Sequence, residues 1–273
     1  MTAEIRLLKS EIRRLRKKVT ELTPSLETLL KLRSFRVYKK DPAEDLIMPQ
    51  KKYIRSYVEK LKRYSFRLFI RDVIKHQNFF TLENVTRYST VNVTQQYIDY
   101  LLRTGVIEIF RSGYRTKKRP IKSFGETLEW FIAELIKREF EAEVLWGVKF
   151  KRPKVGGDYD IIAKIESSII YMEIKSSPPK QIYDKEIAAF LDRVEDLSPA
   201  ISIFLVDTEL RMKDKIVPMF EAELQRRYTK PAPVARIERE LFHIDRRIFI
   251  INSKENIESN IGKVLSFWNQ SRV

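Results

Sequence analysis

The 273-residue chain contains no cysteine and only two histidines, His76 and His243. The lack of cysteine excludes disulfide bonds, thiol catalysis, iron–sulfur clusters and cysteine-ligated zinc. Two isolated histidines also argue against a histidine-rich metal site or a Ser-His-Asp triad. No apolar run approaches the roughly 20 residues of a membrane span, and the charged N-terminus does not resemble a signal peptide. We therefore expect a soluble cytoplasmic protein with no membrane partner.

Positive charge is concentrated in one half of the sequence. The net charge is +16; residues 1–124 hold 29 basic and 12 acidic side chains, whereas residues 125–273 hold 24 and 25. A basic region beside a neutral one is typical of a protein with a polyanionic partner. We favour nucleic acid, which also predicts association with the nucleoid. An acidic membrane surface and a merely solvated charged surface are the alternatives.

Residues 4–23 show the hydrophobic repeat of a coiled coil. Apolar residues alternate at spacings of three and four, with β-branched side chains at every a position and leucine at every d position. This choice favours a parallel two-stranded coil, and hence a homodimer. Because the repeat is short and ends before Pro24, a helix packed on its own chain is an equal alternative. The six seam residues are Ile5, Leu8, Ile12, Leu15, Val19 and Leu22.

Residues 51–122 are predicted to form three helices and a hairpin. A long helix covers residues 53–75, a short second helix follows, and a third ends before a strand and return at residues 106–116. The residues that can break, cap or end these helices are Asn78, Thr81, Thr90, Asn92 and Gly105. The order resembles a winged helix-turn-helix domain.

That resemblance implies a DNA-binding surface, in which the third helix enters the major groove and the wing contacts the backbone. The side chains that would face bases are Asn92, Thr94, Gln95 and Gln96. Those that would contact phosphate are Arg111, Arg115, Lys117, Lys118 and Arg119. Winged helices also serve as protein–protein modules, but the run of cations in the wing favours DNA.

Residues 123–273 carry the pattern of a mixed α/β layer fold. Hydrophobic periodicity predicts the order αβββαβ, and a further strand and a terminal helix close the region. The predicted core elements are a helix at 123–140, strands at 144–150, 160–163 and 169–175, a helix at 184–197 and a strand at 201–206.

The strand at residues 169–175 is apolar except for Glu173 and Lys175, which lie two residues apart and therefore share a face. An apolar strand does not bury a carboxylate and an ammonium without cause. Asp160 opens the neighbouring apolar strand. Two strand-borne carboxylates beside a lysine can hold Mg²⁺, with Mn²⁺ as a substitute, and activate a water. The set therefore predicts metal-assisted phosphodiester hydrolysis.

Taken together, the Gly125-x₃-Glu129 helix start, Asp160 and Glu173-x-Lys175 resemble the PD-(D/E)xK nuclease superfamily. The likeness is strongest to archaeal Holliday-junction resolvases and restriction-type nucleases. It implies a restriction-endonuclease-like core in which Asp160, Glu173 and the backbone carbonyl of Ile174 bind metal. It also implies that Lys175 serves the water and that Glu129 completes the site.

One departure from the family pattern leaves two candidates for the first acid. Gly157-Asp158-Tyr159-Asp160 stands where the family has Pro-Asp, and we favour Asp160 because it leads into the apolar strand. The sequence thus predicts three regions: a heptad helix and linker (1–50), a winged helix (51–122) and a nuclease-like domain (123–273). We expect a Mg²⁺-dependent DNA endonuclease, acting on branched or otherwise structured DNA. The alternative is a DNA-binding regulator or scaffold whose nuclease-like domain does not cut.

Overall fold

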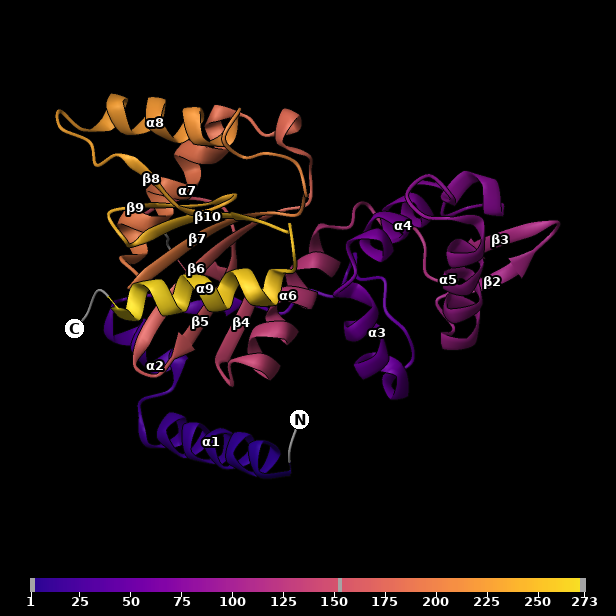
Figure 1. Cartoon of the computed structure of the whole chain (residues 1–273), viewed down its shortest axis with the longest axis horizontal. Helices are drawn as coiled ribbons and strands as arrows, with labels where there is room; N and C mark the ends of the chain where they lie inside the picture. Colours follow the sequence, from indigo (N-terminus) through magenta and orange to yellow (C-terminus); the bar gives the residue numbers. More distant parts are fainter. Residues whose placement is uncertain (1–2, 152–153, 271–273) are drawn as a thin grey trace. The chain divides into compact units, whose positions relative to one another are not determined.

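The computed structural model describes residues 3–151 and 154–270 and contains two compact units (Figure 1). The α/β unit joins the N-terminal segment, as far as Asp41, to the chain from Ile132 onward. The helical unit is Pro42–Phe131. These boundaries differ from the three predicted regions, because the N-terminal segment folds with the α/β unit. None of the helices in the described ranges is both long and apolar enough to cross a membrane.

An eight-stranded sheet forms the centre of the α/β unit. The pairs β6–β7 and β7–β10 are parallel, and all other neighbours are antiparallel. Across the sheet the strands are β1 (Val37–Lys39), β4 (Glu143–Phe150), β5 (Tyr159–Ile165), β6 (Ser168–Lys175), β7 (Ile201–Val206), β10 (Ile248–Asn252), β9 (Leu241–Ile244) and β8 (Val234–Glu238).

Helices cover both faces of this sheet. On one face, Phe190 of α7 (Asp184–Leu197) and Phe220 of α8 (Ile216–Arg227) pack on Phe204 of β7. On the other face, Phe249 of β10 meets Phe267 of α9 (Ile257–Gln270). The order α6 (Gly125–Glu139), β4, β5, β6, α7, β7 matches the predicted αβββαβ order, and the bounds of α7 and β7 are those that periodicity predicts.

The N-terminal segment joins the α/β unit through a buried lysine. Lys164 of β5 has no exposed side-chain surface; its Nζ pairs with Glu143 of β4 and donates to Thr23 Oγ1 (3.0 Å) and to the carbonyl of Pro24 (2.9 Å). These bonds satisfy the buried ammonium and fix the junction between α1 (Ala3–Leu22) and α2 (Leu26–Leu32). Lys164 thus helps to join the N-terminal segment to the α/β unit.

The helical unit contains the predicted succession of helices and a hairpin, with one difference. The predicted long helix is divided at Arg63, whose backbone is extended. The buried guanidinium of Arg67 donates to the carbonyls of Leu61 (2.6 Å) and Lys62 (3.2 Å), which replaces helical hydrogen bonds at the break. The elements are η1 (Lys51–Tyr53), α3 (Ile54–Leu61), α4 (Tyr64–Lys75), η2 (Leu82–Val85), α5 (Val91–Thr104), β2 (Ile107–Phe110) and β3 (Gly113–Thr116).

The third helix of this unit begins and ends where the sequence predicts. Thr90 caps α5, since its side chain accepts a hydrogen bond from the Val93 amide (3.4 Å). Gly105 ends α5 in the left-handed conformation, at φ 77°. The hairpin then joins the helices, because Phe80 forms a β-bridge with Tyr114 of β3. Local capping signals therefore determined the bounds of α5.

Candidate active site

The fold brings three predicted site residues together at one edge of the sheet. The register of β5 and β6 pairs Ile161 with Met172, so Asp160 lies at the position opposite Glu173. The Oδ2 atom of Asp160 accepts a hydrogen bond from the amide of Ile174 (2.7 Å). Lys175 Nζ lies 2.8 Å from Glu173 Oε1. Asp160, Glu173 and Lys175 therefore form one cluster.

The competing acid, Asp158, points to a different partner. Its side chain is 48% exposed, and its Oδ1 lies 3.0 Å from Lys149 Nζ. Asp158 also precedes β5, which begins at Tyr159, whereas Asp160 is inside the strand and held by the end of β6. The geometry therefore favours Asp160 over Asp158 as the partner of Glu173.

Helix α7 supplies two further charged groups that the sequence reasoning missed. Glu186 Oε1 lies 3.2 Å from Lys175 Nζ, and Arg193 Nη1 lies 3.0 Å from Glu173 Oε2. The two residues are seven apart, or two helical turns, and so share the face of α7 that covers the sheet. The seven-residue spacing beside an apolar stripe could have indicated that Glu186 and Arg193 face the sheet. It could not have indicated which strand they meet.

The carboxylate of Glu173 is buried and has three donors around it. Its side chain is 4% exposed and receives hydrogen bonds from Lys175, Arg193 and the hydroxyl of Tyr171, which lies two residues earlier on the same face of β6. Bonds to two cations and a hydroxyl compensate the loss of water around this carboxylate. The same arrangement places two positive charges beside a residue predicted to bind metal.

The electrostatics of the cluster keep Lys175 protonated. Burial lowers the pKa of Lys175, but the carboxylates of Glu173, Asp160 and Glu186 together outweigh it and raise that pKa above the usual value for lysine. Burial also raises the pKa of the Tyr171 hydroxyl, as do the neighbouring carboxylates of Glu173 and Asp160. At neutral pH the cluster therefore contains an ammonium and a neutral phenol that both face carboxylates.

The donor set fits a magnesium ion but not a metal site built wholly from protein ligands. Within residues 3–151 and 154–270, no three acidic, histidine or cysteine side chains gather closely enough to hold a metal. Mg²⁺ commonly takes only one or two carboxylates and completes its shell with water and substrate phosphate oxygens. Asp160 and Glu173 meet that requirement, with the carbonyl of Ile174 beside them on β6. Glu129 lies on the part of α6 that belongs to the helical unit.

The predicted base-reading residues of α5 differ in exposure. Asn92 and Gln96 are exposed, and Gln95 is half-buried and donates to Asp99 Oδ1 (2.8 Å). Thr94 is fully buried; its hydroxyl donates to the carbonyl of Thr90 (3.0 Å). The prediction that Thr94 faces bases is therefore wrong, because this side chain stabilises the first turn of the helix instead.

The predicted phosphate-binding cations lie in and after the hairpin. Arg111, Lys117, Lys118 and Arg119 are exposed; Lys118 donates to the carbonyl of Ala43 (2.7 Å), and Arg119 donates to the carbonyl of Thr116. Arg115 is half-buried and pairs with Glu108 across the hairpin (2.7 Å). Within this group, Arg111 and Lys117 therefore have the fewest hydrogen bonds and ion pairs with other described residues.

The two structural units divide the charged residues differently from the two halves of the sequence. The helical unit holds 17 basic and 9 acidic side chains, and the α/β unit holds 36 and 28, so each carries a net charge of +8. The excess in the α/β unit comes almost wholly from residues 1–41, with 12 basic and 5 acidic side chains. The expectation of one basic and one neutral domain is therefore wrong, since the basic N-terminal segment belongs to the α/β unit.

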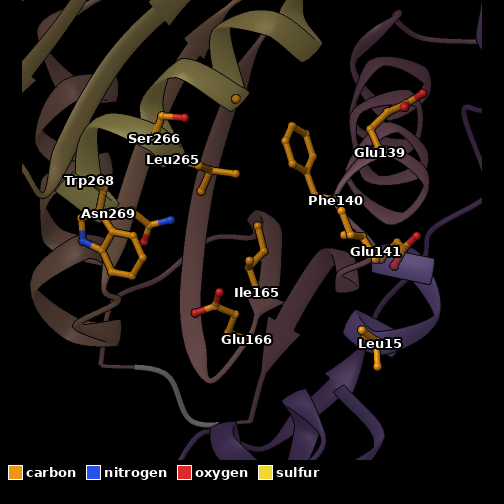
Figure 2. A pocket seen from close by; sticks show the side chains of 12 residues that line it. Leu15, Glu139, Phe140, Glu141, Ile165, Glu166, Leu265, Ser266, Trp268 and Asn269 are labelled. Atoms are coloured by element: carbon orange, nitrogen blue, oxygen red, sulfur yellow. The ribbon is translucent and has the colours of Figure 1, made fainter. Parts of the chain in front are cut away.

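Helix α1 leaves its hydrophobic seam largely uncovered. Leu8 is 57% exposed, Ile12 and Leu15 are 49% exposed, and Leu22 is 86% exposed. The side chains of Ile5 and Val19, the other two seam residues, lie outside the described residues. Figure 2 shows Leu15 across a cavity of about 660 Å³ from Phe140, Leu265 and Trp268 of the same unit. Packing within the chain therefore does not fill the described part of this seam.

Comparison with known proteins supports the fold alone. No protein-family model and no curated protein matches the sequence. Can2 from Sulfobacillus thermosulfidooxidans, solved in complex with cyclic tetra-adenylate, aligns with a TM-score of 0.51 and 13% identity over 89% of this chain and 60% of that chain. Protein VC1899 from Vibrio cholerae aligns with a TM-score of 0.50 and 14% identity over 88% and 60%. The chain thus spans about three fifths of the length of both proteins and shares an α/β fold with them.

Proposed function

We propose that the protein is a metal-dependent endonuclease that hydrolyses phosphodiester bonds in DNA, with a PD-(D/E)xK-type site. The observation that carries this proposal is the juxtaposition of Asp160, Glu173 and Lys175 at the edge of β5 and β6. Two carboxylates and a lysine at one edge of a sheet are what the chemistry needs and what a purely structural sheet has no reason to assemble.

Each residue of the cluster has a distinct role in this proposal. Asp160, Glu173 and the carbonyl of Ile174 would hold Mg²⁺ or Mn²⁺, and Glu129 remains a proposed fourth ligand. The ion would lower the pKa of bound water and offset charge on the phosphate. Lys175 would orient or deprotonate the attacking water and offset the negative charge that develops on the phosphate. Cleavage then leaves a 5′-phosphate and a 3′-hydroxyl.

The helical unit would supply affinity for duplex DNA as a winged helix. Its succession of helices and hairpin, with exposed Asn92 and Gln96 on α5 and exposed cations after the hairpin, supports this role. Amide side chains suit base edges, and cations suit the phosphate backbone. In this proposal the amides of α5 would contact bases, and the exposed cations would contact the backbone.

We also propose that two chains pair through α1. The seam of α1 is uncovered at Leu8, Ile12, Leu15 and Leu22, and a second copy offers the complementary set. A parallel pairing brings Glu4 and Glu11 of one chain opposite Lys9 and Arg16 of the other. Since each chain has one cluster and duplex DNA has two strands, pairing supplies one site for each strand.

A cleavage panel tests the nuclease proposal against the alternative of a non-cutting DNA-binding scaffold. Branched, linear and circular DNAs, and an RNA, are incubated with Mg²⁺, Mn²⁺ or EDTA. We expect cleavage with either ion, none in EDTA and none with Glu173→Gln. Cutting that persists in EDTA would remove the metal mechanism. Tight DNA binding without cutting of any substrate would favour the scaffold.

A further inference from the structure

Arg193 occupies the position that a metal at Glu173 would have to share. Its Nη1 donates to Glu173 Oε2 (3.0 Å), and its side chain is 11% exposed. Both oxygens of Glu173 accept hydrogen bonds from cations, Oε1 from Lys175 and Oε2 from Arg193. A guanidinium and a divalent ion at the same carboxylate repel each other. An internal cation thus competes with the metal for Glu173.

The contacts of Arg193 leave part of its hydrogen-bonding capacity unused. Its Nε atom is buried and has no hydrogen-bond partner in the structure. Its contact with Glu173 runs through Nη1 alone, not through both arms of the fork that arginine prefers for carboxylate or phosphate. A buried donor without a partner destabilises the arrangement that contains it. The bond to Glu173 is therefore not the arrangement that best satisfies this guanidinium.

The loop before Asp160 keeps the guanidinium at the border of the site. Gly157 has φ 98°, and a Cβ added there would lie 2.5 Å from Arg193 Nη2. The positive φ favours glycine at this position, and the absence of a Cβ leaves room for Arg193 Nη2. On its other side, the guanidinium carbon lies 5.9 Å from the centre of the Tyr159 ring. Arg193 thus lies between Glu173 and the chain that leads directly into Asp160.

We infer that Arg193 is a phosphate-binding residue that pairs with Glu173 when no metal is bound. When a divalent ion occupies Glu173, Arg193 leaves that carboxylate and binds a phosphate oxygen of the nucleic acid backbone, a ligand that matches its fork. Metal binding and substrate binding then favour each other. The metal releases Arg193 for the phosphate, and the phosphate keeps the guanidinium away from the metal. This inference rests on the proposed nuclease function and adds a coupling between the two ligands.

Metal affinity without nucleic acid gives the first test. Binding of Mn²⁺ to the full-length protein is measured by calorimetry for the wild type, Arg193→Gln and the control Arg247→Gln, which removes an exposed arginine at the opposite edge of the parallel strands. We expect Arg193→Gln to bind Mn²⁺ about tenfold more tightly, since it removes the competing charge, and the control to match the wild type. Unchanged or weaker binding by Arg193→Gln overturns the inference.

The second test measures how DNA changes the affinity for Mn²⁺. All variants carry Lys175→Ala and are compared with the Lys175→Ala single variant. We expect duplex DNA to tighten Mn²⁺ binding in this background and to lose that effect when Arg193→Gln or Arg193→Lys is added. The lysine variant keeps the charge but lacks the fork, and it serves if the glutamine variant fails to fold. Full coupling in Arg193→Lys contradicts the inference. Since neither test measures cleavage, a chain that cuts nothing would refute the proposed function while leaving these affinities informative.

Discussion

The Glu173 cluster of the α/β unit and the hairpin cations of the helical unit use charged side chains in opposite ways. In the α/β unit, Glu173 and Lys175 lie against oppositely charged partners and are largely shielded from solvent. In the helical unit, Arg111 and Lys117 are exposed and have few partners. A buried, paired charge is held in a fixed position, which suits chemistry, whereas an exposed charge is suited to a polyanion that it can meet in many positions. Under the proposed function, catalysis would lie in the α/β unit and affinity for DNA in the helical unit.

The largest expected effect is on cleavage, after removal of a clustered charge. Asp160→Ala and Lys175→Ala should each reduce the cleavage rate by roughly 1000-fold or more, because each removes a metal ligand or the group that orients the water. Affinity for DNA, measured by fluorescence anisotropy, should stay within a few fold of the wild type. Asp158→Ala is the matched control and should cut far better than Asp160→Ala, since Asp158 pairs with Lys149 instead. The reverse ranking would show that Asp158 is the catalytic acid.

The next largest effect is expected on the pairing of two chains through α1. Ile12→Asp combined with Leu15→Asp places like charges in the seam and should weaken pairing by roughly 100-fold, giving monomers in light scattering. Leu7→Asp is the control, because Leu7 is 71% exposed and lies outside the heptad seam. A wild type that is monomeric at micromolar concentration, with or without DNA, would refute pairing through α1.

A smaller effect is expected on DNA affinity. Arg111→Gln combined with Lys117→Gln should weaken binding about tenfold and reduce the salt dependence by about two ions, since each phosphate contact contributes about 0.9 to the log–log slope. The control, Lys230→Gln with Arg247→Gln, removes two exposed cations from the α/β unit. An equal loss in the control would mean that the charge of the whole chain, and not the hairpin, determines binding.

Local patterns in the sequence predicted most of the elements and part of the site. The bounds of α7 and β7 follow from hydrophobic periodicity, and Thr90 and Gly105 mark the ends of α5. Asp160 and Glu173 could be paired in advance because they lie on consecutive strands. In a hairpin-connected pair, spacing along the chain determines which residues lie opposite each other. These features depend on residues near one another in sequence.

Only the tertiary structure decided which distant groups meet these elements. Arg193 and Glu186 reach the site because α7 packs on β6, and Lys164 is buried because residues from the N-terminal segment surround its ammonium. Thr94 is buried by the packing of α5 although its position in the helix permitted exposure. The periodicity of a helix shows which of its faces is covered, but not by what. The element that covers a helix face is determined by the burial and the charge pairing of the whole unit. No local sequence pattern contains this information.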